Sequence, residues 1–349
     1  MISIIICSRY SSLSQELQSN IHATIGACEY ELVHIDNSEN KYNIFEAYNL
    51  GVRKAQGDIL CFMHEDILFH SKDWGGKMAR WLANDEYGIM GVAGGYAVLA
   101  QSDWRLYGKC LVNLIQGYNT IEENCKYYVF PNSSRKAKRK LKEPVEVAAL
   151  DGVWFCIRKE LFDKISFDEI TYDGFHMYDT DICMQIHKLG KKVMICPDVL
   201  LEHLSVGSYT PAFVTGLSAF HAKWKDYLPV IKTITLTDEQ IEALHQRGES
   251  RLKEYIILDG VKNGLKQLFS EKAKGLPIRP FTDKEKSVMK KSKYTYCKAT
   301  IKNRNLSFSE VYRSVRPYLM DHYCPNKHKI VLKFIWYRTM IGLKRRTYD

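Results

Sequence analysis

Short apolar runs rich in β-branched residues alternate with segments of helical periodicity over the first 100 residues of this 349-residue chain. Runs of this kind are typical of strands buried on both faces, and they predict strands at 2–7, 30–35, 59–63 and 89–92. Between them, apolar residues recur at helical spacing and predict helices at 17–25, 44–55 and 74–83. This alternation predicts an α/β fold with an open, mostly parallel sheet and helices on both faces.

The rest of the chain has a weaker pattern. Residues 101–144 read as irregular and include a basic polar loop at 131–140. Further strands are predicted at 145–150, 153–157 and 192–196, and helices at 158–164 and 179–189, the second ended by Gly190. Residues 200–208 read as a loop, and the chain beyond about residue 212 as mostly helical. We therefore expect an α/β domain at 1–228 and a helical, basic C-terminal region at 229–349.

The composition is that of a folded globular protein, with 46% hydrophobic and 26% charged residues, and it excludes disordered and collagen-like classes. No apolar run reaches the length of about 18 residues that indicates a transmembrane helix. The N-terminus has no basic segment or small-residue cleavage site, so it is not read as a signal peptide. Ten scattered cysteines, none in a CxxC motif, predict reduced thiols and a cytoplasmic protein.

Charge is distributed unevenly. From residue 270 onward 20 Lys and Arg face 6 Asp and Glu, a net charge of about +14, whereas the preceding residues carry 30 against 34, about −4. Such asymmetry indicates an anionic partner, either phosphate-bearing lipid or nucleic acid, unless the basic face is simply solvated. Near the C-terminus Val331, Phe334 and Ile335 would share a helical face. We expect peripheral contact with the inner face of the membrane, the alternative being that these residues pack on the first domain.

Polar residues follow the predicted strands at the edge where α/β proteins bind ligands. They are Ser8 and Arg9 after the first strand, Asp36 and Asn37 after the second, and His64, Glu65 and Asp66 after the third. Carboxylates in such positions suit Mg²⁺ or Mn²⁺, which take oxygen ligands and keep substrate phosphates in their shell. Each acid taken alone is equally a turn or helix-capping residue, and Asp179 does open a predicted helix.

Several motifs resemble one known family. They are SIIICSRY at the first strand, HIDNSENKYNIFEAYNLGVRKAQGDILCFMHEDIL through the third, DGVWFCIRKELFDKISFDE, and FHMYDTDICMQIHKLGKKVMI. Together they are similar to the inverting, family-two nucleotide-sugar glycosyltransferases of the GT-A fold, over about residues 1–225. The details look like a bacterial subfamily related to a streptomycin-biosynthesis-type glycosyltransferase domain.

The resemblance implies an inverting, metal-dependent hexosyltransferase. It would move a sugar from a nucleotide-diphosphate donor to a hydroxyl of a glycan or lipid-linked acceptor, in bacterial surface polysaccharide synthesis. Asp179 matches the catalytic base, and Mn²⁺ or Mg²⁺ would be held by Asp66, His64 and His203. The donor-binding residues implied are Ser8, Arg9, Asp36, Asn37, Arg53, Glu65 and Asp66, and those on the acceptor side are Asp151, Gly152 and Trp154.

Two positions depart from the family pattern. His64 replaces the first acid of the DXD metal motif, and Tyr178 replaces the Glu of the usual Glu-Asp pair. Imidazole suits Mn²⁺ better than Mg²⁺. The departures leave open a catalytically impaired sugar-nucleotide-binding protein. A basic nucleic-acid-binding protein is the alternative from another class, although no helix-turn-helix, RNP or zinc-finger signature is present.

Overall fold

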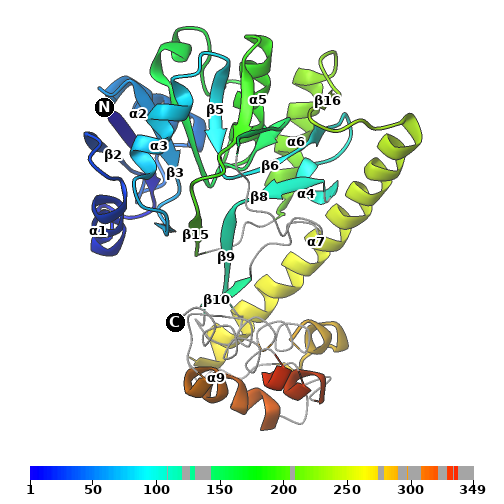
Figure 1. Ribbon diagram of the computed structural model, residues 1–349. Helices are drawn as coiled ribbons and strands as arrows, with labels where there is room; N and C mark the ends of the chain where they lie inside the picture. Colours follow the sequence, from blue (N-terminus) through cyan, green and yellow to red (C-terminus); the bar gives the residue numbers. More distant parts are fainter. Residues whose placement is uncertain are drawn as a thin grey trace. The chain divides into compact units, whose positions relative to one another are not determined.

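A seven-stranded sheet in the order β11-β14-β5-β13-β3-β1-β2 is the centre of the first part of the chain (Figure 1). The computed structural model describes residues 1–107, 109–119, 126–129, 143–204, 209–273, 279–289, 297, 308–320, 328–332 and 334–336. The sheet strands are β1 (Ile2–Ser8), β2 (Tyr30–Asp36), β3 (Ile59–Met63), β5 (Tyr87–Gly91), β11 (Val145–Glu146), β13 (Trp154–Arg158) and β14 (Lys192–Ile195).

The sheet is mixed: three of its six neighbouring pairs are parallel, and five of its seven strands run in the same direction. β1 lies parallel to both β2 and β3, and β5 lies parallel to β14. β13 runs antiparallel between β3 and β5, and β11 runs antiparallel along β14. The predicted α/β class, with an open sheet most of whose strands run in one direction, is therefore confirmed.

The helices cover the two faces of this sheet because successive strand residues point to opposite sides. Ile4 of β1 packs in one core with residues of α1 (Gln15–Thr24) and α3 (Trp74–Leu82). Its neighbour Ile5 packs in a second core with α2 (Ile44–Lys54) and α5 (Tyr178–Lys188). The predicted helices are thus confirmed, and the predicted helix at 158–164 is a short 3-10 helix, η1 (Lys159–Asp163).

Short strands account for most of the differences from the predicted elements. The segment expected to be irregular contains α4 (Trp104–Tyr107), β8 (Cys110–Val112), β9 (Leu114–Asn119) and β10 (Lys126–Val129). The sequence pattern also missed β4 (Ile67–Phe69), β6 (Ala93–Gly95), β7 (Ala97–Val98), β15 (Leu201–His203) and β16 (Val230–Ile231). The prediction of a loop through 200–208 was wrong at β15, because a three-residue strand is defined by its distant partner and not by its own periodicity. The basic loop at 131–140 lies outside the described residues.

The chain divides into two compact units. The first comprises Met1–Ile115, Pro131–His203 and Tyr209–Glu254; the second comprises Gln116–Phe130, Leu204–Ser208 and Tyr255–Asp349. The division predicted after residue 228 lies within the first unit. Most of the described residues beyond about residue 212 are helical, as predicted, with α6 (Pro211–Trp224), α7 (Asp238–Ala273) and α9 (Phe308–Met320). Within the described ranges, no helix has the length and apolar character needed to cross a membrane, and the cysteines are free thiols.

Asp181 is a buried hub that ties α5 to its surroundings. Its carboxylate accepts hydrogen bonds from the Tyr172 hydroxyl at 2.8 Å, the Trp224 indole at 2.7 Å and the Gln185 amide at 2.8 Å. The Lys223 ammonium lies 2.8 Å from Oδ1 and supplies the countercharge. The side chain is 1% exposed, so all of these partners are needed to offset its lost hydration.

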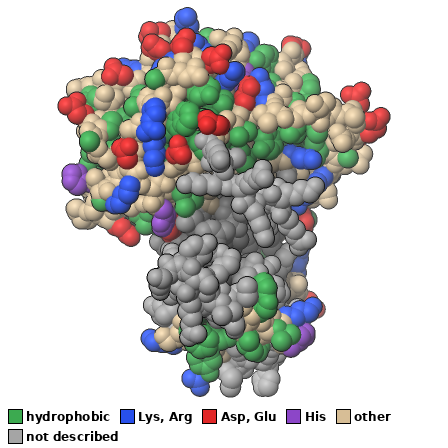
Figure 2. All heavy atoms as spheres, in the orientation of Figure 1, with side chains coloured by type: hydrophobic (Ala, Val, Ile, Leu, Met, Phe, Trp, Pro, Cys, Tyr) green, Lys and Arg blue, Asp and Glu red, His purple; other side chains and the backbone are tan. Residues whose placement is uncertain are grey.

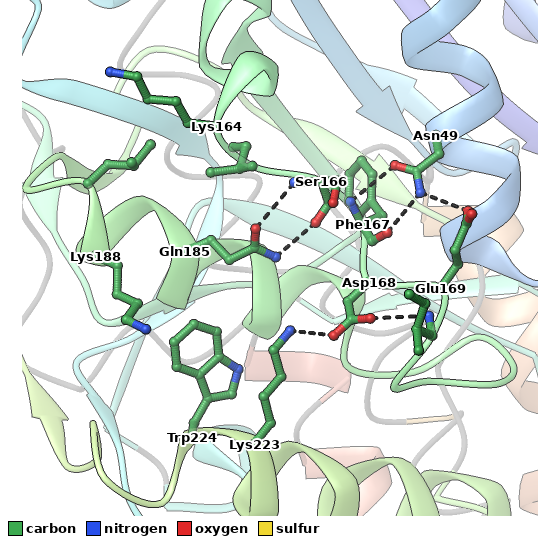
Figure 3. Close-up of a pocket in the computed structure, with 13 residues that line it drawn as sticks. Asn49, Lys164, Ser166, Phe167, Asp168, Glu169, Gln185, Lys188, Lys223 and Trp224 are labelled. Carbon is green, nitrogen blue, oxygen red and sulfur yellow. Dashed lines mark hydrogen bonds and ion pairs between the residues drawn. The ribbon is translucent and has the colours of Figure 1, made fainter.

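A cavity of about 450 Å³ lies beside this hub, near the last turn of α5 (Figure 3). Two side-chain amides, one from α2 and one from α5, form hydrogen bonds with the backbone of residues 166–167, which line the cavity. The Asn49 amide pairs with the backbone of Phe167, at 3.1 Å to its N–H and 2.8 Å to its carbonyl. The Gln185 amide pairs in the same way with the backbone of Ser166, at 3.2 and 2.8 Å. Of α5, Gln185 and Lys188 line the cavity, whereas Asp179 lies in the first turn of the helix and does not.

Replacing Asp181 by Ala should destabilise the protein strongly, because Lys223 and three further donors lose their buried acceptor. Breaking a buried ion pair by removing one partner costs about 3–5 kcal/mol, which corresponds to a fall in melting temperature of roughly 10 °C. Thermal unfolding followed by circular dichroism measures the change. The control is Asp226→Ala, which replaces an exposed aspartate on the loop after α6. This variant should melt within about 1–2 °C of wild type. Equal melting of the two variants would contradict the structural role of Asp181.

Candidate functional site

The carboxyl ends of β1 and β3 carry three interacting residues. The Ser8 hydroxyl donates to the Glu65 carboxylate, which also accepts from the Arg9 backbone N–H at 3.0 Å and the Arg9 Nε at 2.8 Å. Ser8 is buried, whereas the Arg9 side chain is 77% exposed. Three of the predicted donor-binding residues therefore lie together, with Glu65 holding the loop after β1 and Arg9 facing solvent.

The other predicted donor-binding residues differ in their placement. Asp36 ends β2 on the same edge, is exposed, and accepts from the Ser38 N–H at 2.9 Å. The buried Asn37 amide is satisfied by the backbone of Tyr42, with 2.9 Å contacts to its N–H and its carbonyl. Arg53 lies on the last turn of α2, which leads to the amino end of β3, so its assignment to the donor site was wrong.

A three-residue cluster, His64, Asp66 and His203, lies just beyond β3, and its ligand atoms all fall within 4.8 Å of one another. His64 Nδ1 is 3.3 Å from His203 Nε2, and His203 Nε2 is 3.4 Å from Asp66 Oδ1. His203 arrives there because β15 pairs antiparallel with β4, placing it opposite Ile67. The predicted metal ligands are thus brought together in one group.

Spacings of 3.3–4.0 Å among two imidazoles and a carboxylate fit one divalent cation, and the mixed nitrogen and oxygen donors suit Mn²⁺ better than Mg²⁺. Tyr178 orients the first imidazole, since its hydroxyl lies 2.9 Å from His64 Nε2 and donates to the Gly152 carbonyl at 3.1 Å. Burial and the neighbouring His203 lower the pKa of His64 to about 4. His64 is therefore neutral at physiological pH, as a ligand must be.

Asp179 lies in the first turn of α5 and is buried among donors. Its Oδ2 accepts from Arg105 Nη2 at 2.5 Å and from the Gly152 N–H at 2.6 Å, and its Oδ1 accepts from the Thr180 N–H at 2.7 Å. Burial raises the pKa of Asp179, although Arg105 and the two N–H groups oppose this. Its role as the catalytic base stays a prediction. The carboxylate to which it applies is buried, and both of its oxygens accept hydrogen bonds.

The predicted acceptor-side residues fall into two groups. Asp151 and Gly152 lie on the loop before β13, and the next residue, Val153, accepts the His64 N–H at 3.1 Å. Trp154, by contrast, is fully buried in the core, with ring contacts of 6.0 Å to both Phe69 and Trp74. Its assignment to the acceptor side was therefore wrong, because the first residue of β13 points to the core.

Arg105 is the functional residue that sequence reasoning missed. It lies on α4, within the stretch that read as irregular, and contacts Asp103 at 2.9 Å, Asp151 at 3.1 Å and Asp179 at 2.5 Å. Its sequence neighbours Trp104 and Leu106 are large apolar residues, and both are buried. Apolar neighbours are the one feature of the local sequence that indicates a buried segment here. The carboxylates that it joins come from three separate segments, so no spacing in the sequence indicates the cluster.

Comparison with known proteins gives a family match. A family model described as "Glycosyltransferase like family" matches residues 3–212. A search of curated proteins finds no match. Similar solved structures include GalNAc-T7 with UDP, GalNAc and Mn²⁺, at 14% identity and a TM-score of 0.40, covering 81% of this chain and 59% of that chain. S. aureus TarS 1–349 in complex with UDP-GlcNAc is 12% identical with a TM-score of 0.39, covering 100% of this chain and 92% of that one.

Replacing His203 by Ala should weaken Mn²⁺ binding by more than about 10²-fold, because the cluster loses one of its three ligands and loss of even an outer-shell partner costs 10–100-fold. Isothermal titration calorimetry with Mn²⁺, alone and with UDP, measures this. His22→Ala is the matched control, since His22 is exposed in the last turn of α1 and lies outside the cluster. Wild-type affinity for Mn²⁺ in His203→Ala would exclude the cluster as the cation site.

Proposed function

The chain belongs to the glycosyltransferase-like family, and we propose that it transfers a sugar from a nucleotide-diphosphate donor to a hydroxyl of a glycan or lipid-linked acceptor, with inversion. One observation carries the proposal: in this member of the family, three residues that could hold a metal ion, His64, Asp66 and His203, lie together just beyond the carboxyl end of β3. That edge is where α/β proteins bind nucleotides.

The donor's leaving group sets the chemistry that the site must perform. When the bond between the anomeric carbon and the diphosphate breaks, negative charge develops on the β-phosphate oxygen. A divalent cation on His64, Asp66 and His203 would neutralise that charge. Arg9, whose side chain is exposed just after β1, would contact a phosphate of the same donor. Asp36, exposed at the end of β2, would accept from the base or ribose.

The acceptor hydroxyl must lose a proton, because its pKa lies far above 7. The groups available are the carboxylates around Arg105, and Asp179 is the one that the family resemblance indicates. Attack from the face opposite the diphosphate then inverts the anomeric centre.

The intact three-ligand cluster favours an active enzyme over a catalytically impaired sugar-nucleotide binder. His64 replaces an acid of the family motif, yet His203 completes a set of three ligands. Tyr178, which replaces the other family acid, orients His64. The two residues that replace family acids, His64 and Tyr178, therefore contact each other.

The second unit supports a contact with anionic lipid, as expected of an enzyme that acts on a lipid-linked or surface glycan in a bacterial cytoplasm. In the helical residues 328–332 and 334–336, Ile330 is buried while Leu332, Ile335 and Trp336 are 57–65% exposed. Phe334 was predicted to share that face with Ile335, but it is less exposed. Its ring centroid lies 4.9 Å from that of Phe308 of α9. The basic residues of this region favour an anionic bilayer at about 1 kcal/mol each.

Figure 2 shows hydrophobic side chains beside Lys, Arg and His side chains on the visible face of the second unit. Lys329 is exposed on the same helical stretch as Leu332 and Trp336, and Arg313 and Arg316 are exposed on α9. Apolar groups inserted among basic ones are the pattern of proteins that lie on a bilayer surface. The residues near the C-terminus that were expected to add to this face, from 337 onward, lie outside the described part of the chain.

A panel of nucleotide sugars with Mn²⁺ or Mg²⁺ tests the transferase proposal. The true donor should raise the melting temperature of the full chain by several degrees, because it binds the native state, and it should do so more with Mn²⁺ than without. Release of the nucleoside diphosphate from that donor, followed by chromatography, should require the cation. No stabilisation by any nucleotide sugar, and no release, would contradict the proposal.

Flotation with lipid vesicles tests the membrane contact. The full chain should float with phosphatidylcholine vesicles that contain phosphatidylglycerol at low salt, and should be released at high salt. The double variant Leu332→Glu, Trp336→Glu should bind at least about tenfold more weakly, because it loses two inserted apolar side chains. The control is Ile170→Glu, at a residue of the first unit that is 95% exposed. Equal flotation of the double variant and the control would contradict the lipid contact.

A further inference from the structure

The first half of α7 packs against the segment that carries Arg105, and both belong to the first unit. Leu244 of α7 is buried in the same core as Tyr107 of α4. One turn further along α7, a Cβ at Gly248 would lie 2.2 Å from Ser102 Oγ and 3.2 Å from Tyr107 Cε1. A larger side chain at this glycine would therefore displace either the helix or the segment beside it.

A hydrogen bond from α7 ties the same segment. Arg251 Nη1 donates at 3.0 Å to the carbonyl of Leu106, the residue after Arg105. α4 is four residues long, and the last four carbonyls of a helix lack partners within it. The Leu106 carbonyl therefore needs an outside donor. α7 supplies a charged one, which makes the stronger kind of hydrogen bond.

The same segment also contacts the first turn of α5. The Trp104 indole donates to the Thr180 hydroxyl at 3.2 Å, and Arg105 Nη2 donates to Asp179 at 2.5 Å. The Arg105 guanidinium also lies 4.4 Å from the centre of the Trp104 ring. Because α4 contacts both α7 and α5, a displacement of α7 would reach Asp179 through this one short helix.

Arg105 has to keep one position for all of its partners to stay paired. Its Nη1 lies 2.9 Å from Asp103 and its Nε 3.1 Å from Asp151, while Nη2 contacts Asp179. The guanidinium is a rigid plane, so moving it would break several of these contacts together. The side chain of Asp179 is 6% exposed, and it would then be a buried carboxylate without a countercharge.

We propose that Gly248 and Arg251 of α7 are positioning residues for sugar transfer. They hold α4 in place, and α4 in turn aims Arg105 at Asp179. The inference rests on the proposed function, in which Asp179 takes the proton of the acceptor hydroxyl. Neither α7 residue belongs to the cation cluster or to the predicted donor-binding residues. A change at either should therefore slow catalysis and leave donor binding intact.

Hydrolysis of UDP-sugars by the full chain tests the role of Arg251. The probes are UDP-N-acetylglucosamine, UDP-glucose and UDP-galactose with Mn²⁺, and water takes the place of the acceptor hydroxyl. Arg251→Ala should lower kcat by about tenfold or more, because a misplacement of about 1 Å can cost roughly 10²-fold. The Kd for UDP with Mn²⁺ should stay at the wild-type value. Arg251→Lys should restore most of the rate, because an ammonium can also donate to the Leu106 carbonyl.

Arg247→Ala is the matched control, since Arg247 is an exposed arginine on the same helix, one turn before Arg251. Its kcat should lie within about twofold of the wild-type value. Gly248→Ala is a second, independent change at the contact, and it should lower kcat as Arg251→Ala does, because the added Cβ displaces the segment that carries α4. Circular dichroism confirms that each variant is folded.

Hydrogen exchange followed by mass spectrometry tests the contact without any donor. In Arg251→Ala, peptides that cover 102–107 and 178–181 should exchange at least about fivefold faster than in wild type, because the local structure opens more easily. Peptides that cover α1 should be unchanged, and Arg247→Ala should match wild type throughout. Wild-type exchange over 102–107 in Arg251→Ala would contradict the role of α7.

The outcomes separate the two proposals. If wild type hydrolyses a donor but Arg251→Ala keeps more than half of the wild-type kcat, the positioning role is wrong and the transferase proposal stands. A loss of UDP affinity in Arg251→Ala as large as its loss of rate would show a general defect of the fold, and would also overturn the positioning role. If wild type neither binds UDP nor cleaves any donor, the proposed function fails, and the role of α7 in catalysis fails with it.

Discussion

Two buried carboxylates at the start of α5 fix the arrangement of the site. Burying a charge is unfavourable unless an opposite charge and hydrogen-bond donors surround it, and α5 buries both Asp179 and Asp181 in its first turn. Arg105 pairs with the first and Lys223 with the second. The two ion pairs fix the first turn of α5. The loop before β13 is fixed in turn, because its Gly152 N–H donates to Asp179.

His64, Asp66 and His203 could together hold a metal ion although the first acid of the DXD motif that the sequence resembles is absent. His64 stands where an oxygen ligand is expected, yet β15 supplies His203 from a segment 139 residues away in sequence. The pairing of β15 with β4 is short, and its register places His203 against Asp66. The result is a set of two nitrogen donors and one oxygen donor, whose chemistry favours Mn²⁺ over the harder Mg²⁺.

The sequence predicted the main elements of the first unit well, since long apolar runs and helical periodicity reflect burial in the central sheet. β3 begins and ends at the predicted residues, and α2 ends one residue before its predicted end. Elements defined by a partner were missed. β15 is three residues long and Arg105 lies on a helix of four, so neither has a period to detect. Trp154 and Arg53 were assigned to the site from motif position, which does not show the direction of a side chain.

Gly152 makes the cation cluster and the carboxylate group parts of one structure. A Cβ at this position would lie 2.1 Å from the Tyr178 hydroxyl, so a larger residue would push Tyr178 away. That hydroxyl contacts His64, while the Gly152 N–H contacts Asp179. A single glycine thus lets an aromatic side chain of α5 reach His64 and lets a backbone N–H of the loop reach the first turn of the same helix. The ligand geometry at His64 and the carboxylate geometry around Arg105 are therefore set together, because both depend on the close packing of α5 against this loop.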